Sequence, residues 1–175
     1  MAEDKKFKPD KTILSRIQSH DEAVNLAVID QLRNVGKAGY LPYLVRLARL
    51  TPHQTVHVAV FRLLNDLKNQ SAAPFIADAI RDETNRPILK KLVESCWQNR
   101  LDFSQHLHLF TDLLIHETDE ISFEAFTVIE NMETMPGDTA LKKEVGRLEK
   151  HLGPAGETRK YFIREAIKAI SSVMD

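Results

Sequence analysis

Residues 32–44 read LRNVGKAGYLPYL. The segment opens on apolar residues spaced as at the end of a helix, and then passes through a short polar turn that holds Gly36 and Gly39. Pro42 and a second apolar run follow directly. Proline is tolerated in the first turn of a helix, because the N–H group that it lacks has no partner inside the helix there. The segment therefore predicts two helices joined by a tight turn.

The same arrangement recurs along the chain. Residues 64–76, LNDLKNQSAAPFI, again place a proline ahead of an apolar helix. Four segments share an adjacent apolar pair followed by an apolar position about one turn later: Ala27-Val28 with Leu32, Ala59-Val60 with Leu63-Leu64, Leu92-Val93 with Cys96-Trp97, and Ala125-Phe126 with Ile129. The pairs begin at residues 27, 59, 92 and 125, so they repeat every 32 or 33 residues. This spacing forms one stripe of an α-helix and does not fit the alternation of a strand.

Further helices complete the predicted pattern. Apolar residues from Ile13 to Ile17 indicate a short first helix, and Gly153-Pro154 separates two helices at the end of the chain. The remaining predicted helices are those that precede the later three stripes, 40–50, 72–80 and 103–115, and the final pair, 138–152 and 158–174.

Two helix starts carry capping signals. Ser19 is followed three residues later by Glu22, which is the spacing of a capping box. Thr51-Pro52 combines a preferred N-cap residue with proline at the first helical position. We therefore expect Ser19 and Thr51 to cap the helices that follow them.

A helix end rich in leucine, a short polar or glycine turn and a proline ahead of an apolar helix together resemble the HEAT-repeat family, especially its shorter bacterial members. The resemblance covers residues 20–134 and weakens at the third junction, 98–103, which has no glycine. It implies an all-α fold: a right-handed α-α superhelix, or solenoid, of about four to five antiparallel helix pairs. The period here is shorter than the roughly 40 residues of longer HEAT units.

The resemblance and the polarity of the ends predict how the chain is organised. Residues 1–9 are expected to form a flexible tail, because they are polar and lie at a terminus. Residues 10–175 are expected to form a single solenoid domain. Its final helix pair, at about 136–175, carries many charges and would cap the stack against solvent.

Composition narrows the classes of function. The chain has 175 residues, of which 43% are hydrophobic and 28% charged, as in folded globular proteins. Its net charge of −1 argues against a dedicated nucleic-acid-binding protein, which usually has a basic excess. The start, MAEDKK, lacks the apolar core of a signal peptide, and no apolar run has membrane-spanning length. We expect a cytoplasmic protein with no membrane contact.

Signals for catalysis are weak. His53 and His57 are four residues apart and could face one metal ion, but Gln54 stands where a zincin has its glutamate. A metal-dependent enzyme is therefore kept only as an alternative. His116-Glu117 is a single dipeptide, whereas the deoxyhypusine hydroxylases, a di-iron family built from HEAT repeats, use several. Cys96, the one cysteine, falls in a core stripe. We expect a non-enzymatic protein with no cofactor and no metal.

Nucleic-acid binding is the other alternative, by analogy with HEAT-like DNA glycosylases. Trp97 would supply a stacking ring, and Arg86, Lys90 and Lys91 form a nearby basic cluster. Trp97 has the helical phase of the core leucines, however, and the next repeat supplies acids that would repel phosphates: Glu117, Asp119, Glu120 and Glu124. The interpretation of Trp97 as a core residue is favoured.

The face opposite each stripe predicts where a partner binds. At about 100° per residue, the positions one before and two after each stripe's first residue point away from the core. In the first two repeats these positions are apolar, and arginines border them. In the third and fourth repeats they are polar: Lys91, Glu94, Glu124 and Thr127. The predicted partner-binding residues are Leu26, Ile29, Arg33, Val58, Phe61 and Arg62. The expected occupant is a protein partner or peptide, with packing inside the solenoid or a second copy of the chain as alternatives.

Overall fold

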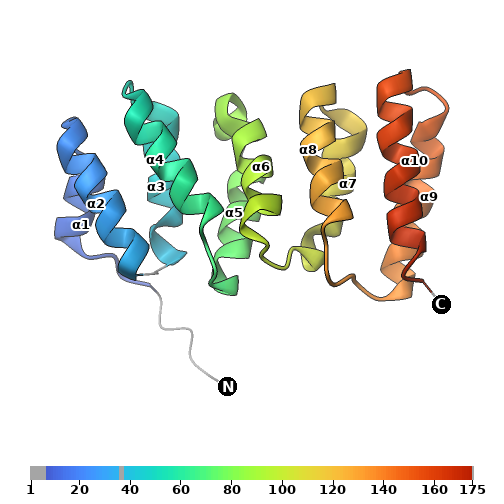
Figure 1. Ribbon diagram of the computed structural model, residues 1–175, viewed down its shortest axis with the longest axis horizontal. Coiled ribbons are helices and arrows are strands. Elements are labelled where there is room, and N and C mark those ends of the chain that lie inside the picture. Colours follow the sequence, from blue (N-terminus) through green and yellow to red (C-terminus); the bar gives the residue numbers. More distant parts are fainter. Residues whose placement is uncertain (1–6, 36–37, 175) are drawn as a thin grey trace. The chain divides into compact units, whose positions relative to one another are not determined.

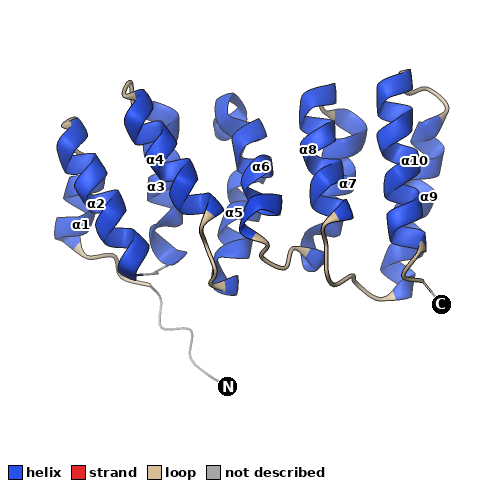
Figure 2. Cartoon of the chain, in the orientation of Figure 1, coloured by secondary structure: helices blue, strands red, loops and turns tan. Residues whose placement is uncertain are grey.

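The computed structural model describes residues 7–35 and 38–174, and within these ranges the protein is all-α, with ten α-helices and no strand (Figures 1 and 2). The all-α prediction is confirmed. The helices are α1 Lys11–Ile17, α2 Glu22–Val35, α3 Leu41–Leu50, α4 Gln54–Asn65, α5 Ala73–Arg81, α6 Leu89–Asn99, α7 Leu107–His116, α8 Asp119–Glu130, α9 Asp138–Leu152 and α10 Glu157–Ser171. Short 3₁₀ turns occur at η1 Ala38–Tyr40, η2 Gln70–Ala72, η3 Glu83–Ile88 and η4 Ser104–His106.

The helices form two compact units, Met1–Ile88 and Leu89–Asp175. In the first unit, α1 packs on α2, α3 packs on α4, and α2 also contacts α4. In the second unit, α7 packs on α8 and α9 on α10, while α8 also contacts α6 and α10. Packing is thus sequential within each unit: a helix contacts its own partner and the equivalent helix of the next pair. Figure 1 shows this order by colour.

The helix starts follow the prolines but not the predicted caps. Pro42 and Pro74 lie in the first turns of α3 and α5, as predicted. The Asp21 carboxylate, not Ser19, accepts from the backbone N–H of Val24 at 3.1 Å. The Ser19 and Thr51 hydroxyls each accept the N–H group two residues ahead, at 3.1 and 3.2 Å. Each hydroxyl thus closes a short turn before its helix begins, which Ser and Thr side chains commonly do. Neither hydroxyl accepts a hydrogen bond from the first turn of the helix, so the two predicted caps are wrong.

The buried stripe of the first unit lies one residue later than predicted. In α2, Ala27 is exposed whereas Val28 and Ile29 are 0% and 1% exposed. In α4, Ala59 is half-buried whereas Phe61 is only 6% exposed. One residue corresponds to about 100° of rotation about the helix axis. The physical reason is side-chain size: branched and aromatic residues remove more apolar area from water than alanine does, so they take the core and alanine is left at its edge.

In the second unit the predicted stripes occupy the core, including Ala125, because the residues that follow the two apolar pairs, Glu94 and Thr127, are polar and do not compete for the core. Trp97 is the exception and is half-buried. The buried members are Leu92, Val93, Cys96, Ala125, Phe126 and Ile129.

The segment that precedes α1 packs on the start of α3. The predicted tail, 1–9, falls largely outside the described residues, which begin at Phe7. The Phe7 ring meets the Tyr40 ring edge to face, with ring centroids 5.0 Å apart. The backbone N–H of Asp10 donates to the Tyr40 hydroxyl at 2.9 Å. A Cβ atom on Gly39 would lie 2.4 Å from the Phe7 ring, so glycine is needed for this contact.

A buried carboxylate joins α7 to α9. Glu144 of α9 is 5% exposed and accepts hydrogen bonds from the Thr111 hydroxyl at 2.5 Å and from Arg147 at 2.7 Å. Its other oxygen lies 2.9 Å from His108 Nδ1. Burial by itself raises the pKa of Glu144, but the hydrogen bonds from Thr111, His108 and Arg147 outweigh burial, and the pKa is lowered. The ionised carboxylate therefore stabilises the α7–α9 contact.

We expect Glu144→Gln to lower the free energy of unfolding of the second unit by about 1–2 kcal/mol at pH 7, because charge-assisted hydrogen bonds are lost. A carboxyl whose pKa is lowered by folding stabilises the native state above its unfolded pKa and loses that effect as the pH falls through the folded pKa. The difference between variant and wild type should therefore narrow below about pH 4. Trp97, the single tryptophan, belongs to this unit and reports its unfolding in urea.

Glu149→Gln is the matched control, because Glu149 is exposed on the same helix. An equal loss of stability in both variants, or a Glu144→Gln effect that persists unchanged at pH 3, would contradict this account of the network.

Candidate binding sites

The predicted partner-binding face on α2 and α4 does not form an exposed apolar surface. Ile29 and Phe61 are buried, so the prediction that they point outward is wrong, for the reason of register given above. Leu26 is half-buried, and Val58 is 45% exposed. The predicted border is present: Arg33 and Arg62 are exposed, and Arg33 lies 3.5 Å from the Asp66 carboxylate.

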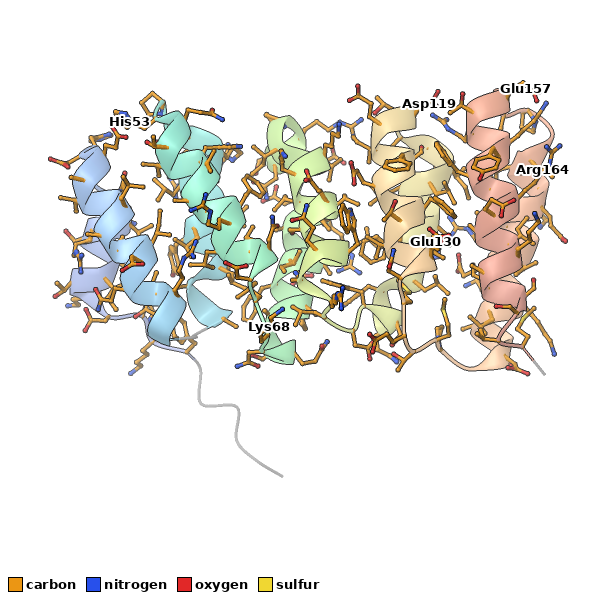
Figure 3. The ribbon with its side chains drawn as sticks, viewed as in Figure 1. His53, Lys68, Asp119, Glu130, Glu157 and Arg164 are labelled. Atoms are coloured by element: carbon orange, nitrogen blue, oxygen red, sulfur yellow. The ribbon has the colours of Figure 1, made fainter. Side chains whose placement is uncertain are left out.

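Exposed aromatic rings gather instead on α8 and α10, which pack side by side (Figure 3). Phe123 of α8 and Tyr161 of α10 are 48% and 58% exposed. Phe162 lies between them, with ring centroids 5.7 Å from Phe123 and 5.9 Å from Tyr161. Phe126, which is buried, stacks beneath Phe162 at 5.7 Å and 18°. We call Phe123, Tyr161 and Phe162 the aromatic patch.

Ion pairs border the aromatic patch about one turn toward the starts of both helices. Arg159 of α10 reaches across to Asp119 of α8, with Nη2 and Oδ1 3.0 Å apart. Arg159 also donates to the carbonyl oxygens of Ile115, at 3.2 Å, and Glu117. Lys160 pairs with Glu157 at 2.8 Å. These bonds fix α10 against the α7–α8 corner and hold the rings of the two helices together.

Sequence reasoning missed the aromatic patch. It placed Glu124 and Thr127 on the outward face of α8 and so predicted a polar surface. Glu124 is in fact 7% exposed and accepts a hydrogen bond from the indole N–H of Trp97 at 2.9 Å, so its predicted outward position is wrong. One sequence signal could have revealed the patch: the adjacent aromatic residues Tyr161 and Phe162 lie in the final helix pair, which was expected to be polar.

A second candidate site is a cleft of about 430 Å³ in the first unit. It lies between the α1–α2 turn, α3 and the α3–α4 turn. The residues that line it, which we call the α1–α3 cleft, are Ile17, Gln18, Ser19, His20, Asn25, Tyr43, Arg46, Leu47, Leu50, Thr51, Pro52 and His53. A volume in this range is typical of ligand pockets.

Asn25 is a buried polar residue of this cleft. It is 2% exposed, and its side-chain N–H₂ group donates to the carbonyl oxygens of Arg16 at 2.9 Å and Ile17 at 3.3 Å. These carbonyls end α1, where no intrahelical donor remains for them. Asn25 thus fastens the end of α1 to α2 and fixes one wall of the cleft.

The two histidines of the metal hypothesis, His53 and His57, contact different partners. His53 precedes α4, with Nδ1 3.4 Å from a Glu22 oxygen. His57 Nδ1 lies 3.0 Å from the carbonyl oxygen of Ala48, and its ring contacts Phe61. Within residues 7–35 and 38–174, no group of three or more His, Cys, Asp or Glu side chains is placed to hold a metal ion.

The basic cluster of the nucleic-acid hypothesis is locally paired with acids. Lys91 contacts Glu94 at 2.8 Å, and Lys90 lies 3.8 Å from Glu120. Arg86, the third predicted cation, is exposed in η3. Trp97 is only half-buried, but its indole N–H donates a hydrogen bond to the Glu124 carboxylate, which places a negative charge beside the ring.

Two further features bear on chemistry and location. Cys96 is buried, and burial raises the pKa of its thiol far above the ordinary value, so it stays protonated and unreactive. Among the helices that the structure describes, none is both long and apolar enough to cross a bilayer.

We expect Asn25→Asp to destabilise the protein more than Asn25→Ala, although aspartate is the closer match in shape. Alanine removes two hydrogen bonds, at a cost of about 1–3 kcal/mol. Aspartate at pH 7 also places a buried negative charge against two carbonyl oxygens. Chemical denaturation gives the order of stability, and hydrogen exchange should show faster exchange in α1. An Asn25→Asp variant as stable as the wild type would contradict the assigned role of Asn25.

Comparison with known proteins assigns no family. No protein-family model matches the chain. No curated protein matches it either. The function is therefore inferred from the residues and their geometry.

Proposed function

We propose that this protein is a non-enzymatic scaffold that binds a protein partner through the aromatic patch of α8 and α10. The single observation that carries the proposal is the patch itself: two exposed rings, Phe123 and Tyr161, that share contact with a third, Phe162. Single exposed apolar residues are common on protein surfaces, whereas contiguous ones mark interaction sites.

The chemistry of the patch suits a protein partner. Aromatic residues are enriched at interfaces and supply much of the binding energy, because their rings bury a large area with few rotatable bonds. Phe126 supports Phe162 from below, so the rings are held before a partner arrives. Pre-organisation of this kind lowers the entropic cost of binding. The fitting partner is an apolar helix or an extended segment, with a second copy of the chain as the alternative occupant.

The proposal includes the architecture that the repeats suggest. In a HEAT-like right-handed solenoid, the second helix of each pair lines the concave face. α8 and α10 are second helices, as are α2 and α4, on which the sequence placed the partner. We propose that the helix pairs of both units continue as one such stack, and that its partner surface lies on the later pairs. Sequential packing within each unit supports this arrangement.

We expect Phe123→Asp to weaken partner binding at least about tenfold, because a charged side chain would be buried in an apolar interface. Affinity capture from native lysate identifies the partner, and titration with the purified partner gives the dissociation constant. Circular dichroism checks that each variant is folded. Phe61→Asp is unsuitable, because Phe61 is buried and a charge there would unfold the protein.

Val58→Asp provides the comparison, because Val58 is exposed to a similar degree on α4. Loss of binding in the Phe123 variant with retention in the Val58 variant supports the aromatic patch. Binding that is retained in the Phe123 variant and lost in the Val58 variant would contradict the aromatic patch and would indicate that the partner binds the face of α2 and α4. Sedimentation that changes with concentration in the wild type alone would identify the partner as a second copy.

A further inference from the structure

The α1–α3 cleft lies in the first unit and is separate from the aromatic patch, which belongs to the second. Its basic side chains come from three elements. Arg46 projects from α3, His20 lies in the α1–α2 turn, and His53 lies in the α3–α4 turn. No aspartate or glutamate is among the lining residues, although the whole chain has 25 aspartates and glutamates against 24 lysines and arginines. The cleft therefore favours an anionic ligand.

Two of these basic side chains are unpaired. Arg46 and His20 are exposed and form no hydrogen bond or ion pair with another described residue. His53 differs, because a Glu22 carboxylate oxygen lies 3.4 Å from its Nδ1. An arginine guanidinium presents several N–H donors in a plane and binds a carboxylate through two parallel hydrogen bonds. Arg46 is thus the group best placed to select a carboxylate.

Apolar side chains stand beside Arg46. Leu50, the last residue of α3, is 57% exposed although it is a large aliphatic residue. Leu47, half-buried, and Pro52 continue this apolar wall. A ligand that carried only a charge would leave the wall uncovered, whereas an apolar group next to the charge would cover it.

The same wall offers a side-chain acceptor for a backbone N–H group. Both N–H bonds of Asn25 go to carbonyl oxygens, which fixes the orientation of its amide. Its side-chain oxygen accepts no hydrogen bond from the described residues, although Asn25 is 2% exposed. A peptide N–H group is the natural donor for such an oxygen. This feature distinguishes a peptide from a small carboxylic acid, which has no N–H group to offer.

From these observations we infer that the α1–α3 cleft binds a peptide segment that carries a carboxylate next to a large aliphatic side chain. Arg46 binds the carboxylate, Leu47 and Leu50 receive the aliphatic side chain, and the Asn25 oxygen accepts a backbone N–H. The occupant is an acidic segment of another protein. The cleft acts independently of the aromatic patch, so either site can fail its test without the other.

The test is a titration of the ¹⁵N-labelled full chain, followed by amide shifts, with the end-blocked peptide acetyl-Ala-Leu-Asp-Leu-Ala-amide. The same peptide with asparagine for aspartate is the matched probe, because it keeps the shape and loses the charge. We expect the acidic peptide to shift the amides of residues 46–51, His53 and His20, and to bind at least about fivefold more tightly than the neutral peptide. Arg46→Gln should abolish this preference.

Lys68→Gln is the control, because it removes one positive charge from the first unit at an exposed position outside the cleft. Figure 3 places Lys68 at the opposite end of the helices from His53. This variant should bind the acidic peptide as the wild type does, and so should Phe123→Asp. The spectra of the free variants show whether each is folded.

Three results would overturn the inference. The first is equal affinity for the acidic and neutral peptides, and the second is an unchanged preference in a folded Arg46→Gln variant. The third is 4-methylpentanoate, a branched aliphatic carboxylate without an N–H group, binding as tightly as the acidic peptide, since the cleft would then be a site for small carboxylic acids.

Discussion

The packing of the helices depends on the burial of one wide apolar arc on the second helix of each pair. A helix of 12 residues is marginal in water by itself and is held by tertiary packing. One partner helix covers only part of such an arc, because Val28 and Ile29 of α2 lie about 100° apart around the axis and both are buried. The arc is covered only when the helix of the next pair also packs against it, as α4 does against α2. Sequential packing is the direct consequence.

Both candidate sites arise where this packing leaves side chains uncovered. Around α8 and α10, the Arg159–Asp119 pair and the Glu144 network tie the last helices to α7 and α8, so the rings of the patch meet at fixed distances. In the first unit, Asn25 fastens α1 to α2 and leaves space between the two turns and α3. Polar bonds between neighbouring helices thus set the geometry, while the apolar arcs supply most of the stability.

The sequence predicted the elements well and the surface poorly. Periodicity and proline placement identified all ten helices of the described residues, and α9 has the predicted bounds, because a stripe that repeats about once per turn is a strong signal. The predicted exposure of Ile29, Phe61 and Glu124 was wrong, because an error of one residue in the helix register rotates the predicted face by about 100°. The α1–α3 cleft was missed because its lining comes from two turns and a helix that are distant in sequence. No local pattern carries that information.

The central proposal is that the helix pairs of the two units continue as one stack that presents its second helices on a common face. Double electron–electron resonance between spin labels at Ala27 of α2 and Arg164 of α10, both exposed, measures it most directly. Cys96 is buried and does not interfere with labelling. Four steps of 8–10 Å between neighbouring helices predict one narrow distance distribution centred at roughly 30–40 Å. A centre below about 25 Å, or a broad distribution, would contradict the single stack.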